Sequence, residues 1–139
     1  MIEESITLFR PVGANELRLI EATGMRAFPP RLPEQPIFYP VTNEAYAAQI
    51  ARDWNTKSGS KMGFVTRFAV RNSFLDRYQR HVVGAREHEE YWIPAEDLPA
   101  FNDNILGNIE VIARFTDADR LAADGRPAPA ERDARNAGA

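Results

Sequence analysis

The sequence has no cysteine, two histidines and no long apolar run. With no Cys among 139 residues, disulfides, thiolate zinc sites and cysteine nucleophiles are excluded. Two histidines are too few for an all-histidine metal site. No apolar run reaches the length of about 18 residues that suggests a membrane-spanning helix. The acidic start MIEESITLF lacks the basic-then-apolar pattern of a secretory signal. We therefore expect a cytoplasmic protein without membrane contact.

The chain also has little excess of one charge over the other. The net charge is −3, which gives no positive surface of the kind that duplex nucleic acid requires. Hydrophobic residues make up 44% and charged residues 27% of the chain, a composition typical of one soluble globular domain. A domain of this length buries enough surface to fold without a disulfide or a metal.

The C-terminal segment lacks aromatic residues. None follows Phe115, and Leu121 is the one large apolar residue of segment 117–139, which is otherwise rich in alanine and charge. Such a segment cannot offset the entropy cost of ordering its backbone. We therefore predict a single domain over residues 1–116 and a disordered or partly helical tail, with a short helix around 119–123. The tail is interpreted either as a spacer or as a partner-binding segment.

Hydrophobic periodicity and turn residues predict many short elements. Strands are predicted at residues 6–12, 25–28, 37–41, 63–70, 80–83, 90–93 and 108–115. Short helices are predicted at residues 16–23, 44–54, 72–78 and 95–101. No G-x-G-x-x-G or P-loop follows a strand, and the elements do not alternate as in doubly wound folds. The sequence therefore predicts an α+β fold with a mixed, mostly antiparallel sheet and three or four short helices.

Several finer features follow from the same patterns. Asn15 is predicted to cap the first helix, and Thr42 or Asn43 the second. Four prolines within residues 28–36 predict a stiff extended loop. Apolar alternation predicts inward-facing residues in two strands, namely Phe64, Phe68 and Val70 in one and Ile109, Val111, Ala113 and Phe115 in the other.

Three features are candidates for chemistry. They are Arg10 at the end of a strand, Tyr39 after the proline loop, and the run His88-Glu89-Glu90 before an apolar strand. Each also has a structural interpretation: a rim ion pair for Arg10, a half-buried sheet aromatic for Tyr39, and a solvated turn for the two glutamates. His88-Glu89-Glu90 lacks a second cluster of ligands, so we expect no metal site.

Taken together, these segments resemble the ADP-ribosyltransferase superfamily. The segments are Leu8-Phe9-Arg10-Pro11, Ile37-Phe38-Tyr39-Pro40 and His88-Glu89-Glu90-Tyr91-Trp92-Ile93-Pro94. In that superfamily a first strand carries Arg or His, a second carries Ser-Thr-Ser or Tyr, and a later strand opens with Glu before an apolar run. Over about residues 6–115 the chain also resembles small bacterial proteins that share FRPVG, FPPRLPEQPIFYPV and IARDWN, often labelled as related to ADP-ribosylation or crystallin J.

The resemblance implies NAD as a substrate. Cleavage of the nicotinamide–ribose bond passes through an oxocarbenium-like state, which the Glu90 carboxylate would stabilise. Arg10 would contact the pyrophosphate or ribose, and Tyr39 would stack on nicotinamide. Glu89 and His88 would complete the cofactor-binding set, with His88 where many transferases carry the Gln or Glu that selects the acceptor. The implied ligand is a nucleotide-type small molecule, and its acceptor is unknown.

Two alternatives to an enzyme remain open at this point. One is a catalytically inactive ligand- or protein-binding module on the same fold, using a cleft between the proline loop and the strand that carries Glu89 and Glu90. The other is an unrelated interaction domain in which Trp54 and Trp92 are core residues. The enzyme hypothesis requires Arg10, Tyr39 and Glu90 to converge on one cleft, and it fails if Glu90 points away from Arg10 across the sheet.

Overall fold

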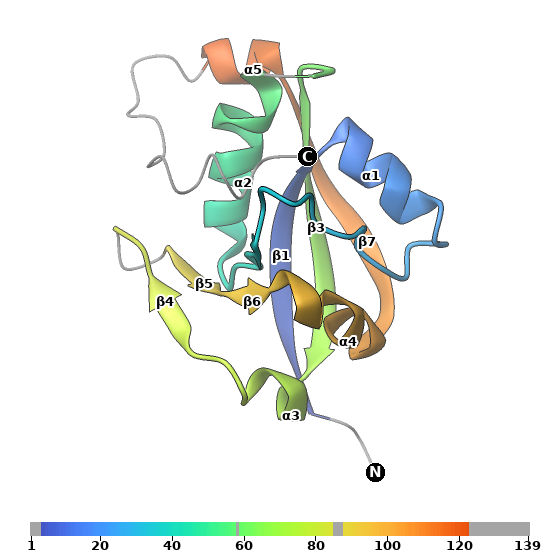
Figure 1. Cartoon of the computed structure of the whole chain (residues 1–139). Helices are drawn as coiled ribbons and strands as arrows, with labels where there is room; N and C mark the ends of the chain where they lie inside the picture. The colour runs from blue at the N-terminus through green and yellow to red at the C-terminus, as the bar shows by residue number, and fades with distance from the viewer. Residues whose placement is uncertain (1–3, 58, 85–87, 123–139) are drawn as a thin grey trace.

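The computed structural model describes residues 4–57, 59–84 and 88–122 (Figure 1). Its strands are β1 (Ser5–Gly13), β2 (Ile37–Phe38), β3 (Met62–Arg71), β4 (Arg80–Val82), β5 (Glu89–Tyr91), β6 (Ile93–Pro94) and β7 (Ile105–Thr116). Its α-helices are α1 (Ala14–Glu21), α2 (Glu44–Asp53), α3 (Asn72–Leu75), α4 (Leu98–Asp103) and α5 (Asp117–Ala122). Two 3-10 turns, η1 (Asn55–Lys57) and η2 (Ala95–Asp97), complete the elements.

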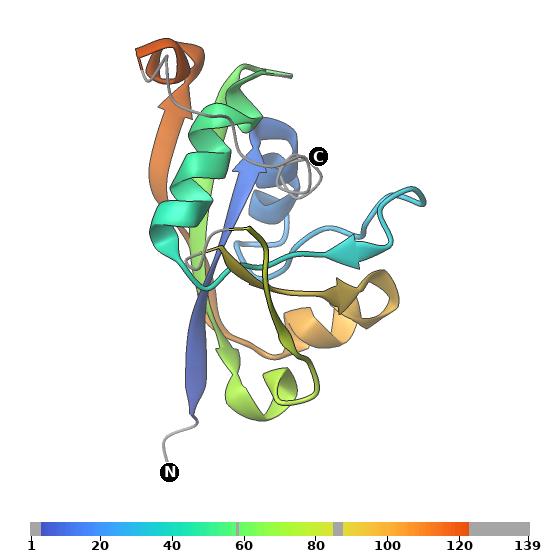
Figure 2. The ribbon, with the colours of Figure 1, turned by 90° about the vertical axis from the view of Figure 1, so that its left-hand side faces the viewer.

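Three long antiparallel strands form the centre of the fold, in the order β1-β3-β7. Val41 extends this sheet beyond β1, because it bridges Phe9 on one side and Glu90 on the other. Strands β5 and β4 follow as an antiparallel pair in which Glu90 lies opposite His81. Strands β2 and β6 form a separate short pair. Figure 2 shows β2, β6 and α4 stacked on one side of the long strands.

Two hydrophobic clusters lie on the two faces of the central sheet. On one face Leu8 and Val12 of β1 pack with Phe38 and Phe101, in the cluster that also includes α1 and α4 residues. On the other face Phe9 packs with Val41 and with the apolar side of α2. Since successive residues of a strand point to opposite faces, β1 contributes to both cores and is buried through its middle. This burial on both faces explains why its apolar residues run without interruption.

Helix α2 forms as its sequence predicts. The Asn43 side chain accepts a hydrogen bond from the backbone N–H of Tyr46 at 2.9 Å and caps the helix. Tyr46, Ala47 and Ile50 are buried against the sheet. The helix approaches β3 closely at Gly63, where an added Cβ would lie 2.2 Å from the carbonyl oxygen of Ala51. Glycine at this position is therefore a packing requirement.

The predicted strand over residues 25–28 is wrong. Met25 has a φ of 64°, which is incompatible with a strand. The backbone amides of Arg26 and Ala27 donate to the Thr23 hydroxyl at 3.1 and 3.0 Å, and that of Phe28 donates to the Asn102 side chain at 2.9 Å. Side chains thus satisfy donors that a strand would have placed in a ladder.

Two predicted helix boundaries are also corrected. Helix α1 begins at Ala14 with Gly13 at the N-cap position, and no side chain caps it. Asn15 instead accepts a hydrogen bond from Arg18 within the helix. The short helix predicted over residues 72–78 ends at Leu75. Helix ends depend on competing local hydrogen bonds and are poorly fixed by propensity.

The pattern predicted for the last strand holds only in part. Ile109 is buried in the core, but Val111 is 42% exposed, whereas the neighbouring Ile112 packs against the α2 cluster. The pairing of β7 with β3 shifts register twice, between Val65 and Thr66 and again before Ala69. The first shift displaces the pairing by one residue and so changes which residues face the core. Strict alternation therefore fails. Strand β3 keeps a continuous register with β1, and its predicted inward residues, Phe64, Phe68 and Val70, are confirmed.

The structure confirms an α+β fold with antiparallel pairing. All strand pairs within the described ranges are antiparallel, and that part of the chain holds five α-helices rather than three or four. Helix α5 occupies the start of the predicted tail; the tail from residue 123 onward lies outside the described residues. None of the described helices has the length and hydropathy needed to span a membrane.

Candidate functional site

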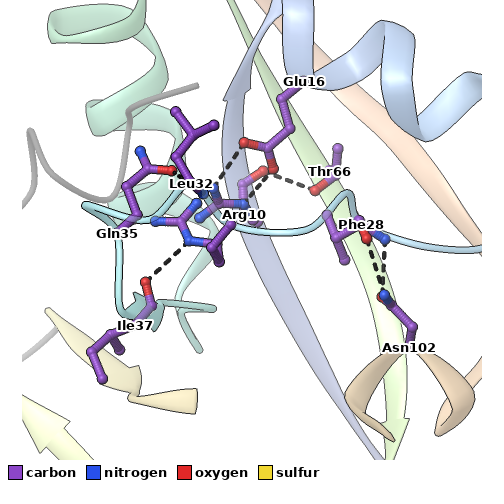
Figure 3. Close-up of polar contacts among 9 residues, drawn as sticks. Arg10, Glu16, Phe28, Leu32, Gln35, Ile37, Thr66 and Asn102 are labelled. Atoms are coloured by element: carbon purple, nitrogen blue, oxygen red, sulfur yellow. Dashed lines mark hydrogen bonds and ion pairs between the residues drawn. The ribbon is translucent and has the colours of Figure 1, made fainter. Parts of the chain in front are cut away.

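Arg10 is fully buried and ion-paired. Its Nε and Nη2 donate to the two carboxylate oxygens of Glu16 at 2.6 and 2.9 Å, and both side chains are almost inaccessible. The guanidinium carbon lies 4.7 Å from the centre of the Phe38 ring. Figure 3 shows Glu16 reaching from α1 to Arg10 on β1. Arg10 therefore forms an ion pair, but inside the protein rather than at its rim.

Glu90 is fully buried on the other face of the sheet. In an antiparallel sheet, directly paired residues point to the same face. Phe9, Val41 and Glu90 are paired in succession, so Glu90 shares the α2 face with Phe9. Arg10, the next residue after Phe9, points to the opposite face. The expectation that Arg10 and Glu90 line one cleft is therefore wrong.

The Glu90 carboxylate lies among aromatic side chains. The Tyr46 hydroxyl donates to Oε2 at 3.3 Å, and the Trp92 indole Nε1 donates to Oε1 at 2.9 Å. The Tyr39 ring meets the Trp92 ring edge-on, with centroids 6.2 Å apart. We call Tyr39, Tyr46, Glu90 and Trp92 the Glu90 cluster. Its carboxylate is held in place by donors from α2 and from the residue that follows β5.

Both histidines stack on this cluster. His88 lies flat on Tyr46 at a centroid distance of 4.2 Å, and His81 lies flat on Trp92 at 3.9 Å. Glu89 points elsewhere: its carboxylate accepts a hydrogen bond from Thr42 at 2.9 Å and lies 3.6 Å from Arg80. The structure thus brings Tyr39, His88 and Glu90 together and turns the Glu89 carboxylate toward Thr42 and Arg80. Arg10 lies on the opposite face of the sheet from Glu90.

Two cavities of the described structure lie along the proline loop. A pocket of about 110 Å³ is lined by Glu16, Leu19, Arg31, Leu32 and Phe38, among others. A second pocket, of about 460 Å³, lies against residues of η2 and α4. The two pockets share Leu19, Pro29 and Pro30. We call them together the proline-loop groove.

The groove is distinct from the cleft of the binding-module hypothesis. The cleft of the binding-module hypothesis was expected between the proline loop and the strand of Glu89 and Glu90. The groove instead lies between the proline loop, α1 and the segment that follows β6, and neither glutamate lines it. Its walls are mainly apolar, with Leu19 and Leu32 each 53% exposed. Neighbouring exposed apolar side chains are typical of binding sites.

Arg31 is a charged residue of the groove that the sequence did not single out. Its Nε donates to the carbonyl oxygen of Ile37 at 3.2 Å, and its guanidinium lies 6.0 Å from the Phe38 ring centre. Burial, and after it the nearby positive charge of Arg10, lower the pKa of Arg31 to about 10. In the sequence, Arg31 is one charged residue among prolines, and no local pattern indicates its partners.

Glu16 and Tyr46 were missed for the same reason. Glu16 is the first acidic residue of a helix, a position that usually interacts with the helix dipole at the surface. Tyr46 belongs to the apolar stripe of α2, and its hydroxyl contact with Glu90 spans 44 residues of sequence. Neither contact has a signature in local spacing. Among the described residues, no three His, Asp or Glu side chains are grouped so as to hold a metal ion.

No protein-family model, curated protein or solved structure matches the chain. The functional argument therefore depends on the residues and geometry described above.

Proposed function

We propose that this protein is a catalytically inactive binding module that takes a small ligand in the proline-loop groove. The observation that carries the proposal is the separation of Arg10 from Glu90 on opposite faces of the sheet. A site for NAD cleavage needs the carboxylate and the phosphate-binding cation to contact the same bound NAD molecule. In this structure Arg10 and Glu90 point to opposite faces of the sheet.

The existing partners of Arg10 and Glu90 also argue against NAD cleavage. Arg10 already gives two hydrogen bonds to Glu16, so a pyrophosphate would have to displace a buried carboxylate. The Glu90 carboxylate is inaccessible and accepts hydrogen bonds from Tyr46 and Trp92. A carboxylate in this position anchors β5 to α2 and does not reach a ribose outside the protein.

The NAD-dependent activity implied by the resemblance is the second candidate. It is favoured by one observation, the gathering of Tyr39, His88 and Glu90 around Tyr46 and Trp92. The residues around Glu90 supply an acid and stacking rings, but the Glu90 side chain itself is inaccessible. For this reason we place the ligand in the groove.

Two measurements separate these functions. NAD and ADP-ribose are titrated into the full chain by calorimetry, and nicotinamide release from NAD is then followed for wild type and Glu90→Gln. The binding-module proposal predicts no nicotinamide release above the rate without protein, for either chain. Release by wild type that is lost in Glu90→Gln would overturn it in favour of the transferase. Tyr46→Phe serves as the matched control, because it alters the same cluster and leaves the carboxylate intact.

A further inference from the structure

The smaller pocket of the proline-loop groove has a buried charge imbalance. Glu16 and Arg31 line it, and Arg10 pairs with Glu16 from within the protein. Both oxygens of Glu16 are taken by Arg10, at 2.6 and 2.9 Å. Glu16 is also the one acidic residue that lines the described part of the pocket. One positive charge, that of Arg31, therefore has no carboxylate of its own in the described part of the pocket.

Arg31 is also incompletely hydrogen-bonded. Its Nε donates to Ile37, but its Nη2 is buried and has no hydrogen-bond partner. A buried donor without an acceptor costs about 1–3 kcal/mol, and more when the group is charged. The lowered pKa of Arg31 reflects the same situation, because burial and the charge of Arg10 both disfavour its cationic form. An anion beside this guanidinium would relieve both costs.

The remaining walls are apolar and rigid. Leu19, Pro29, Pro30 and Phe38 line the pocket with Arg31, and prolines keep their conformation when a ligand binds. The cavity volume of about 110 Å³ is of the order that accommodates a single aromatic ring, since a cavity of roughly 150 Å³ takes up benzene. An apolar body of ring size, with a charged group at one end, fits these walls.

We propose that this pocket binds an aromatic or similarly compact monocarboxylate, whose carboxylate pairs with Arg31 while its apolar body packs between Leu19 and the proline loop. The inference depends on the proposed function and names its ligand class. A single negative charge is favoured because Arg31 supplies a single surplus positive charge. A phosphate dianion would also face the carboxylate of Glu16, which lines the same pocket.

Phenylacetate and its neutral isostere 2-phenylacetamide test the proposal directly. Each is titrated into the full isotope-labelled chain and followed by NMR, including the side-chain Nε–H signal of Arg31. The variants are Arg31→Gln, which removes the charge, and Arg31→Lys, which keeps it. Arg26→Gln is the matched control, because Arg26 is an exposed cation of the same segment that does not line either pocket. Thermal unfolding of each variant verifies that it is folded.

The proposal predicts that phenylacetate binds wild type about tenfold or more tightly than phenylacetamide, a difference of ~1.4 kcal/mol, and shifts the Arg31 signal. This preference disappears in Arg31→Gln, is partly kept in Arg31→Lys and is unchanged in Arg26→Gln. Equal binding of acid and amide would overturn the inference and leave the groove as a binding site. If neither phenylacetate nor phenylacetamide binds, both the inference and the proposal that the groove is a binding site are refuted. Tighter binding of phenyl phosphate than of phenylacetate would refute the preference for a single charge.

Discussion

Replacing Glu16 by glutamine tests the buried charge arrangement most directly. The change removes the negative charge that lies against Arg10, which has an exposed fraction of 0%, while the half-buried cation Arg31 stays close by. Removing one partner of a buried ion pair costs about 3–5 kcal/mol. The two short hydrogen bonds, at 2.6 and 2.9 Å, place Glu16→Gln toward the upper part of that range. Such a loss is a large share of the ~5–15 kcal/mol that stabilises a typical domain.

Urea unfolding measures this loss, with the fluorescence of Trp54 and Trp92 as the reporter. Glu21→Gln is the matched control, since Glu21 is an exposed acid at the end of the same helix, and we expect a change within ~0.5 kcal/mol. The double variant Arg10→Met/Glu16→Leu removes both charges and should regain much of the stability. A loss below ~1 kcal/mol for Glu16→Gln, the value of an exposed ion pair, would refute the argument that this pair is buried and essential.

Three further substitutions test other parts of the fold. Gly63→Ala should lower the free energy of unfolding by about 1–3 kcal/mol, because the new Cβ would lie 2.2 Å from the Ala51 carbonyl oxygen; an unchanged urea midpoint would show that α2 can move away. Burial and the hydrogen bond to Asp97 raise the pKa of Tyr78 from 10.0 to about 12, so the stability that Tyr78 contributes is complete below pH 10 and is lost as the pH rises through about 12. Tyr78→Phe should therefore be less stable than wild type at neutral pH, and the difference should shrink between pH 10 and 12 in unfolding curves; a constant difference would contradict this. Thr23→Ala should cost about 1–2 kcal/mol through two lost backbone contacts, while Thr23→Ser should keep most of the stability in the same urea assay.

The sequence predicted those elements whose signals are local. The stripe of α2 and its Asn43 cap lie within one helix, and both are confirmed. The strand around Phe64 and Phe68 was likewise recognised from its alternation. The prediction for residues 25–28 failed because the Thr23 and Asn102 side chains compete for the same backbone donors. Such competition involves partners distant in sequence, as Asn102 is.

The candidate site was predictable as a set of residues but not as an arrangement. Tyr39, His88 and Glu90 were singled out from the sequence and do lie together around Tyr46 and Trp92. Arg10 was singled out with them, yet it pairs with Glu16 on the opposite face. In an antiparallel sheet a displacement of one residue reverses the face. Only the pairing of Phe9, Val41 and Glu90 shows on which side each charge lies.

By itself the sequence determined an α+β chain with antiparallel strands, a stiff proline loop and few residues suited to chemistry. These properties follow from periodicity, composition and the fixed φ of proline, all of which are local. The tertiary structure decided that Glu16 neutralises Arg10, that Glu90 is held by Tyr46, and that Arg31 remains as the surplus charge beside an apolar groove. Those outcomes depend on strand register and on contacts between segments distant in the chain. Burial decides them because a charge removed from water is costly unless it is paired.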